Sequence, residues 1–162
     1  FNTNYWPGED TFLCDKLKKN DNKILYSPSL IVFHHRREGF LNHIKQINGY
    51  GFHRGYFARK YQKTSLKLFY FIPSLFLLFF LIKILHFMYY KLFFYLFVFL
   101  FSYLIANVYS IFKIFKYENF YISIRTLPYI ISSHFVYGYS FLKGFFTFIN
   151  LSRNRKYLGR FR

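Results

Sequence analysis

The sequence predicts a mainly α-helical chain in which a small polar head precedes a membrane-bound helical part. Hydrophobic residues make up 54% of the 162 residues and aromatic residues 27%, yet the net charge is +17. The charges flank long apolar runs, as basic residues do at the borders of membrane spans. This apolar content excludes a disordered chain over most of the length. The single cysteine, Cys14, excludes a disulfide scaffold.

Charge and hydropathy change near residue 65 and divide the chain in two. Residues 1–65 hold 11 Lys/Arg and 5 Asp/Glu, whereas residues 66–162 hold 12 Lys/Arg and a single acid, Glu118. We therefore expect a polar domain over residues 1–62 and a membrane domain over residues 63–162. Because the chain begins at Phe1 and a catalytic-looking motif follows at residue 8, we expect a large N-terminal portion to precede it in the complete protein.

Two apolar segments, residues 66–85 and 92–112, have the length of about 20 residues that a helical membrane span needs. The second carries no formal charge. Lys67 and Lys83 lie near the ends of the first, where their long stems can reach lipid headgroups. Pro73 should kink the first helix or mark its first turn. The short link predicts a helical hairpin, and the alternative of two buried helices in a soluble protein lacks the polar face it would need.

A third apolar segment, residues 126–150, has apolar side chains near helical spacing but also contains Pro128 and His134. The tail over residues 151–162 carries five basic residues and no acid, so the positive-inside rule places it in the cytoplasm. A third full span would export that tail. Charge therefore favours an interfacial or re-entrant third helix over a spanning one. We expect a multi-pass protein of the cell inner (cytoplasmic) membrane with a cytoplasmic head.

The polar domain is predicted to mix helices and strands. Residues 10–20 have apolar side chains at helical spacing, with Asp10 as the N-cap. Residues 23–26 and 30–34 are typical of two short strands around the turn Ser27-Pro28-Ser29. An amphipathic helix is expected over residues 38–47. Glycines are expected to interrupt it before a second helical piece runs from His53 into the first span: Gly49, Gly51 and Gly55.

Four stretches, taken in chain order, carry a family resemblance: GEDTFLC at residues 8–14, ILYSP at 24–28, HHRR at 34–37 followed by Gln46, GYG and Arg54, and HFVYGYSFLKG at 134–144. Together they resemble the C-terminal end of membrane-bound family-2 glycosyltransferases, which are inverting enzymes with a GT-A nucleotide-sugar fold. The last stretch is similar to a segment of the succinoglycan-type members. The resemblance implies that residues 1–62 form the C-terminal portion of an α/β GT-A catalytic domain.

The function implied by this resemblance is hexosyl transfer from a nucleotide-sugar donor to a lipid-linked saccharide acceptor, in polysaccharide biosynthesis at the cytoplasmic membrane face. An inverting transfer needs a base for the acceptor hydroxyl and stabilisation of the leaving nucleoside diphosphate. The resemblance assigns the base to Asp10, with Glu9 orienting it or contacting the acceptor. An ordinary helix cap is the alternative for this acidic pair.

The candidate residues for binding substrate or its phosphates are basic or amide side chains: His34, His35, Arg36, Arg37, Gln46 and Arg54. Arginine binds phosphate well because its planar fork donates paired hydrogen bonds. The alternative for residues 34–37 is a basic surface that faces anionic lipid. Neighbouring histidines on a strand point to opposite faces, so we expect no metal site there.

Two family features are absent from the chain. Processive members carry Gln-x-x-Arg-Trp, whereas residues 46–50 read QINGY, which disfavours a long-chain polymer synthase. No Asp-x-Asp motif occurs, so the ligands of the divalent metal (Mg or Mn) that the resemblance implies lie outside this sequence. We therefore expect the chain to be a fragment that is inactive without the nucleotide-binding half.

Other function classes are weaker. A non-catalytic membrane anchor or assembly protein is the main alternative. A small transporter is disfavoured because the two spans carry no acidic residue to serve as an ion or proton site. A nucleic-acid partner is not expected, because the aromatic residues lie in uncharged runs and not on a basic face.

Overall fold

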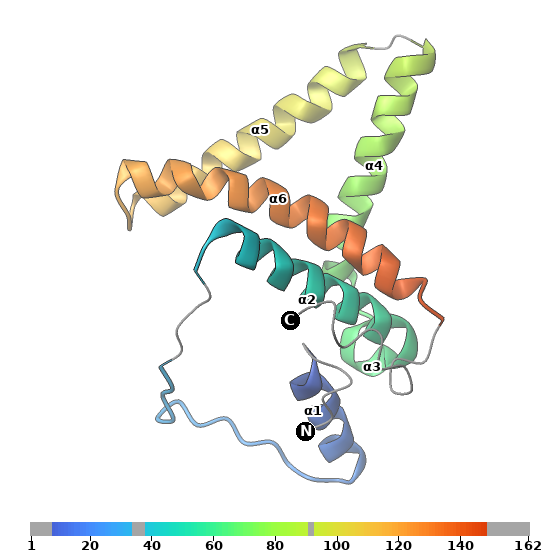
Figure 1. Cartoon of the computed structure of the whole chain (residues 1–162), viewed down its shortest axis with the longest axis vertical. Helices are drawn as coiled ribbons and strands as arrows, with labels where there is room; N and C mark the ends of the chain where they lie inside the picture. The colour runs from blue at the N-terminus through green and yellow to red at the C-terminus, as the bar shows by residue number, and fades with distance from the viewer. Residues whose placement is uncertain (1–7, 34–37, 91–92, 149–162) are drawn as a thin grey trace.

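The computed structural model describes residues 8–33, 38–90 and 93–148. These residues form helices and irregular segments without a strand (Figure 1). The helices are α1 (Glu9–Lys19), α2 (Phe40–Lys60), α3 (Gln62–Ser65), α4 (Leu68–Tyr90), α5 (Phe93–Phe115) and α6 (Phe120–Phe145). The mainly α part of the predicted fold class is therefore confirmed.

The two strands predicted at residues 23–26 and 30–34 are wrong as far as residue 33, where the described part of this segment ends. Residues 22–33 are exposed and irregular, around a turn in which Leu30 N–H donates to the Ser27 carbonyl at 3.2 Å. An isolated hairpin is marginal in water, and a strand gains stability from a neighbouring strand that accepts its backbone hydrogen bonds. No such neighbour exists among the described residues, so the mixed α/β portion of a GT-A domain is not seen.

Helix α1 is present, but its N-cap differs from the prediction. Gly8 is the N-cap, with no side-chain capping bond. Asp10 lies in the first turn, where its carboxylate accepts a hydrogen bond from Thr11 N–H at 2.6 Å. The N-cap role predicted for Asp10 is therefore wrong. The acidic first turn and the lysines of the last turn both complement the helix dipole.

Helix α2 continues through the three glycines that were predicted to interrupt it. Gly49, Gly51 and Gly55 are all buried within it. Each costs about 1 kcal/mol relative to alanine in a helix interior. At Gly51 and Gly55 that cost is offset because the missing side chains let α2 approach α6 at backbone distance.

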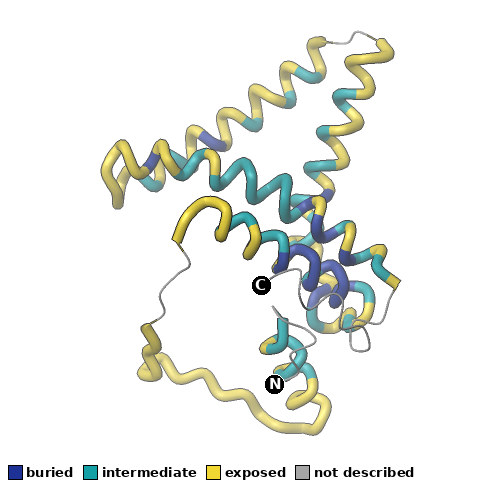
Figure 2. Tube along the Cα trace, viewed as in Figure 1, coloured by how far each residue is buried: buried dark blue, intermediate teal, exposed yellow. Residues whose placement is uncertain are grey.

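Helices α4 and α5 correspond to the two predicted spans. Each has 23 residues and is long and apolar enough to cross a membrane, by length and composition. At 1.5 Å per residue each is about 34 Å long, against about 30 Å for the hydrocarbon core of a bilayer. Only 6% of the most apolar window of each helix is buried (Figure 2). The core helix of a soluble protein would be mostly buried. Pro73 lies inside α4.

Helix α6 crosses the open end of the α4–α5 hairpin, and the two apolar helices rise from it and converge at their far ends (Figure 1). The segment predicted at residues 126–150 is thus helical but begins earlier, where the Asn119 side chain caps it by accepting from Ile122 N–H at 2.9 Å. Pro73 of α4 packs against Gly138 of α6, and the Ser74 hydroxyl donates to the Gly138 carbonyl at 3.0 Å.

Helix α2 lies along α6 and runs in the same direction. The Phe40 and Tyr129 rings are 5.0 Å apart, His43 Nε2 lies 2.8 Å from Ser133 Oγ, and Arg59 donates to the Thr147 carbonyl. At its C-terminal half α2 carries the aromatic cluster Phe52, Tyr56 and Phe57. Phe12 of α1 and Tyr61 pack against this cluster, so α1 is held against the end of α2.

Candidate functional site

The start of α1 and the middle of α2 enclose a cavity of about 60 Å³, lined by Gly8, Asp10, Thr11, Tyr50, His53, Arg54 and Phe57. The four residues from α2 follow the spacing of one helix face. The volume exceeds the roughly 10–15 Å³ that one water molecule needs, so the cavity can hold polar groups of a substrate. It gathers a carboxylate, a guanidinium, an imidazole and a phenol.

Of the two predicted acidic residues, Asp10 lines this cavity and Glu9 does not. Asp10 is exposed, and its carboxylate accepts from Thr11 N–H at 2.6 Å and from the Thr11 hydroxyl at 3.4 Å. Glu9 accepts from Gly8 N–H at 2.8 Å and does not line the cavity. Asp10 is therefore the acid placed to accept a proton there.

Arg54 connects the cavity to the beginning of α4. Its Nη1 donates to Ser65 Oγ at 3.3 Å, and its guanidinium carbon lies 4.6 Å from the centroid of the Tyr70 ring. Ser65 ends α3, and Tyr70 lies in the first turn of the apolar helix α4. Such a cation over an aromatic ring is held by about 0.5–2 kcal/mol.

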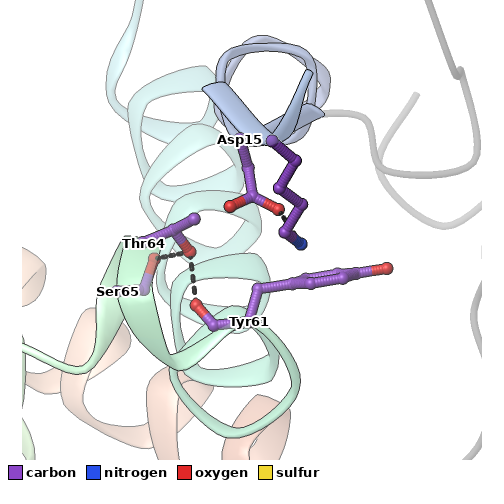
Figure 3. A network of polar contacts seen from close by, with 5 residues as sticks. Asp15, Tyr61, Thr64 and Ser65 are labelled. Atoms are coloured by element: carbon purple, nitrogen blue, oxygen red, sulfur yellow. Dashed lines mark hydrogen bonds and ion pairs between the residues drawn. The ribbon is translucent and has the colours of Figure 1, made fainter. Parts of the chain in front are cut away.

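The short connection through α3 is braced by the hydroxyl of Thr64. This hydroxyl donates to the Tyr61 carbonyl at 2.7 Å and lies 3.2 Å from Ser65 Oγ, the atom that also accepts from Arg54 (Figure 3). Asp15 of α1 pairs with Lys19 at 2.6 Å beside Tyr61. Arg54 is therefore fixed by side chains from α3 and α4 as well as by its own helix.

The charge of Arg54 is not neutralised by a carboxylate. No ion pair with Arg54 occurs among the described residues, which include every Asp and Glu of the chain. Its acidic neighbour on α6 is the Tyr137 hydroxyl, and burial raises the pKa of Tyr137 to about 12 against the opposing effect of the Arg54 charge. Tyr137 therefore stays neutral at physiological pH, and the positive charge at Arg54 is available to an anion.

The remaining predicted residues are placed only in part. Gln46 is exposed, and its side-chain nitrogen donates to the Tyr50 hydroxyl at 3.0 Å, so it touches a residue of the cavity wall. His34, His35, Arg36 and Arg37 lie outside the described residues. The structure thus brings Asp10 and Arg54 together, and it places Gln46 one contact away.

The sequence pattern did not single out Tyr50 or His53 as residues of the cavity. His53 is 5% exposed, and its ring lies 5.5 Å and 6.2 Å from the rings of Phe52 and Phe57. The spacing of Tyr50, His53, Arg54 and Phe57 would have indicated one helix face. That signal was hidden because the helix was expected to end at residue 47.

The close packing of α2 against α6 fixes which face of α2 is turned toward α1. A Cβ at Gly51 would lie 2.9 Å from the Tyr137 carbonyl oxygen, and one at Gly55 would overlap the Phe141 carbonyl oxygen. From the other side, a Cβ at Gly144 would overlap the Phe52 carbonyl oxygen. Gly51 and Gly55 have the small-xxx-small spacing that lets two helices pack backbone to backbone. This spacing is visible in the sequence alone.

The structure offers no ligand set for the expected divalent metal. Among the described residues, no group of three or more His, Cys, Asp or Glu is close enough to hold an ion. The carboxylates of Glu9 and Asp10 are engaged with the amides of Gly8 and Thr11.

Comparison with known proteins identifies no relative of this chain. No family model matches it, and no match was found among curated proteins or solved structures. The family resemblance carried by residues 8–14 and the later stretches therefore stays a prediction.

Proposed function

We propose that this chain is the acceptor-side, membrane-bound end of a glycosyltransferase that moves a sugar from a nucleotide-sugar donor to a lipid-linked acceptor. The observation that carries the proposal is that Asp10 and Arg54 line one cavity, and that Arg54 is stacked on Tyr70 in the first turn of an apolar helix. A base and an anion-binding group thus lie together where the polar part of the chain meets the apolar hairpin.

In the proposed reaction the Asp10 carboxylate takes the proton of the acceptor hydroxyl. The freed oxygen attacks the anomeric carbon of the donor, and a new C–O bond forms as the bond from that carbon to the diphosphate oxygen breaks. The leaving nucleoside diphosphate takes the electron pair, and the Arg54 guanidinium offsets its charge. The nucleotide-binding half and its divalent metal would come from the preceding part of the complete protein.

The proposed location is the cytoplasmic face of the inner membrane, with α4 and α5 as two spans. The ends of this hairpin that lie near α6 carry Lys67, Lys113 and Lys116, which the positive-inside rule assigns to the cytoplasm. A lipid-linked acceptor confined to the same membrane would meet the cavity at high effective concentration, which lowers the entropic cost of the reaction.

The test is sugar transfer by the protein expressed from its complete gene in membranes, with labelled UDP-glucose, UDP-galactose, UDP-N-acetylglucosamine and GDP-mannose as donors. Asp10→Asn should lower the label entering the lipid extract by about 10²- to 10⁴-fold, the usual contribution of a general base. Asp15→Asn is the matched control on the same helix. It loses the ion pair with Lys19, in which the Lys19 side chain is 60% exposed and the Asp15 side chain 11%, and it removes no residue of the cavity lining.

Membrane insertion of both variants should equal that of the wild type. Undiminished transfer by the Asp10→Asn protein would contradict the proposed base. Wild-type protein that transfers no label from any of the four donors would favour the alternative, a non-catalytic membrane anchor or assembly protein.

A further inference from the structure

Three exposed cations lie around the corner where α5 ends and α6 begins, each beside an exposed aromatic ring four residues earlier in the chain. Lys113 Nζ lies 4.9 Å from the Tyr109 ring centroid, and Lys116 Nζ lies 5.4 Å from that of Phe112. The Arg125 guanidinium lies 4.0 Å from the centroid of Tyr121. The six side chains Tyr109, Phe112, Lys113, Lys116, Tyr121 and Arg125 are here called the basic corner.

Helix dipoles do not explain this gathering. Lys113 and Lys116 lie at the C-terminal end of α5, where the dipole stabilises cations. Arg125 lies in the second turn of α6, near the end whose dipole disfavours a cation. Glu118 is the single acid of the corner, and it forms no ion pair with a described residue. Within the described part of the chain, no carboxylate therefore pairs with the cations of the corner.

The distance along α5 places this charge at the depth of lipid headgroups. Lys113 follows Phe93, the first residue of α5, by 20 positions, which is a rise of about 30 Å and equals the thickness of the hydrocarbon core. Aromatic rings and cations favour this level, because the rings sit in the interface while the cations reach phosphate groups.

We propose that the basic corner binds the headgroups of anionic phospholipids, such as phosphatidylglycerol, in the cytoplasmic leaflet. The inference rests on the membrane placement proposed above but not on the sugar-transfer chemistry, because the corner contributes no residue to the Asp10–Arg54 cavity. The ligand is a lipid surface and not free phosphate, because the rings that flank the cations require an apolar layer beside them.

The test uses the full-length protein purified in dodecylmaltoside and measures bound lipid by native mass spectrometry during titration with dioleoyl phosphatidylglycerol or dioleoyl phosphatidylcholine. The wild type should retain phosphatidylglycerol preferentially. The Lys113→Gln/Lys116→Gln/Arg125→Gln protein should lose affinity for it by up to roughly 100-fold, since each cation near an anionic leaflet contributes about fivefold. Binding of phosphatidylcholine should be unchanged.

The matched control is Lys16→Gln/Lys18→Gln/Lys23→Gln, which removes the same charge from exposed positions in and after α1. This control should keep the preference, and an equal loss by both triple variants would overturn the proposal in favour of net charge alone. Competition by millimolar glycerol phosphate that abolishes lipid retention would also overturn it, because the site would then be one for free phosphate. The Asp10→Asn protein should retain the lipid preference, which separates this proposal from the proposed catalysis.

Discussion

Gly55 of α2 lies so close to Phe141 of α6 that a Cβ at Gly55 would overlap the Phe141 carbonyl oxygen. The contact belongs to a parallel helix pair in which Gly51 and Gly144 approach the partner backbone in the same way. Because this pair fixes the rotation of α2, it also decides that Arg54 faces the cavity shared with Asp10.

Gly55→Ala should destabilise the protein, although alanine is the better helix former by about 1 kcal/mol. The added methyl group would push two helix backbones apart, and overpacking of this kind costs about 1–3 kcal/mol or more. Thermal unfolding in detergent should show a lower midpoint than the wild type. Lys45→Ala, at an exposed position of the same helix, should leave the midpoint nearly unchanged, and a raised midpoint for Gly55→Ala would contradict the packing described.

Arg54→Gln should lower sugar transfer by roughly 10- to 100-fold, the equivalent of one charge-assisted hydrogen bond of about 1.5–3 kcal/mol. Arg54→Lys should retain part of the activity, since it keeps the charge but loses the planar fork that meets Ser65 and Tyr70. The measurement is the initial rate in the same membranes. Equal activity of the Gln and Lys variants would show that the charge of Arg54 does not act on the leaving group.

Asn48 of α2 and Ser140 of α6 should be energetically coupled, because the Ser140 hydroxyl donates to the Asn48 side-chain oxygen. A double-mutant cycle with Asn48→Ala and Ser140→Ala should give a coupling of about 1 kcal/mol in the free energy of unfolding. Asn42 and Ser140 provide a control pair, since the Asn42 side chain bonds the Glu38 carbonyl of its own segment. Full additivity for Asn48 and Ser140 would contradict the contact.

Cysteine labelling in intact cells and inverted vesicles should place both ends of α6 on the cytoplasmic side. In a Cys14→Ala background, cysteines at Lys63, Lys116 and Lys143 should react only from the cytoplasm, and one at Tyr90 only from outside. The expectation follows from α6 crossing the hairpin near its open end (Figure 1). Reaction of the Lys143 position from outside would instead make α6 a third span.

The two apolar helices could be predicted from the sequence to within a few residues at most boundaries. Residues 66–85 and 92–112 were expected, and α4 and α5 run over Leu68–Tyr90 and Phe93–Phe115. Their apolar runs fix both type and length, because a segment surrounded by lipid must satisfy its own backbone hydrogen bonds as a helix. The boundary differences at Tyr90 and Phe115 arise because helices continue past the most apolar stretch.

The polar part was harder to predict. β-branched and aromatic residues at 23–26 and 30–33 indicated strands, but strand formation depends on a pairing partner that a local pattern cannot supply. Gly49, Gly51 and Gly55 indicated an interruption, because local propensity counts each glycine as a cost. In α2, Gly51 and Gly55 are what allow the close contact with α6, a partner about 85 residues away along the chain.

The sequence by itself determined the charge segregation and the two apolar helices, and it predicted Asp10 and Arg54 as candidate site residues. Only the tertiary structure decided that these two line one cavity, together with His53 and Tyr50. The physical reason is that a long apolar run surrounded by lipid must satisfy its own backbone hydrogen bonds, so it forms a helix whatever its neighbours are. Which residues of distant segments face one another depends instead on the close contact between α2 and α6. The spacing of Gly51 and Gly55 indicates such a contact but does not say which helix is the partner.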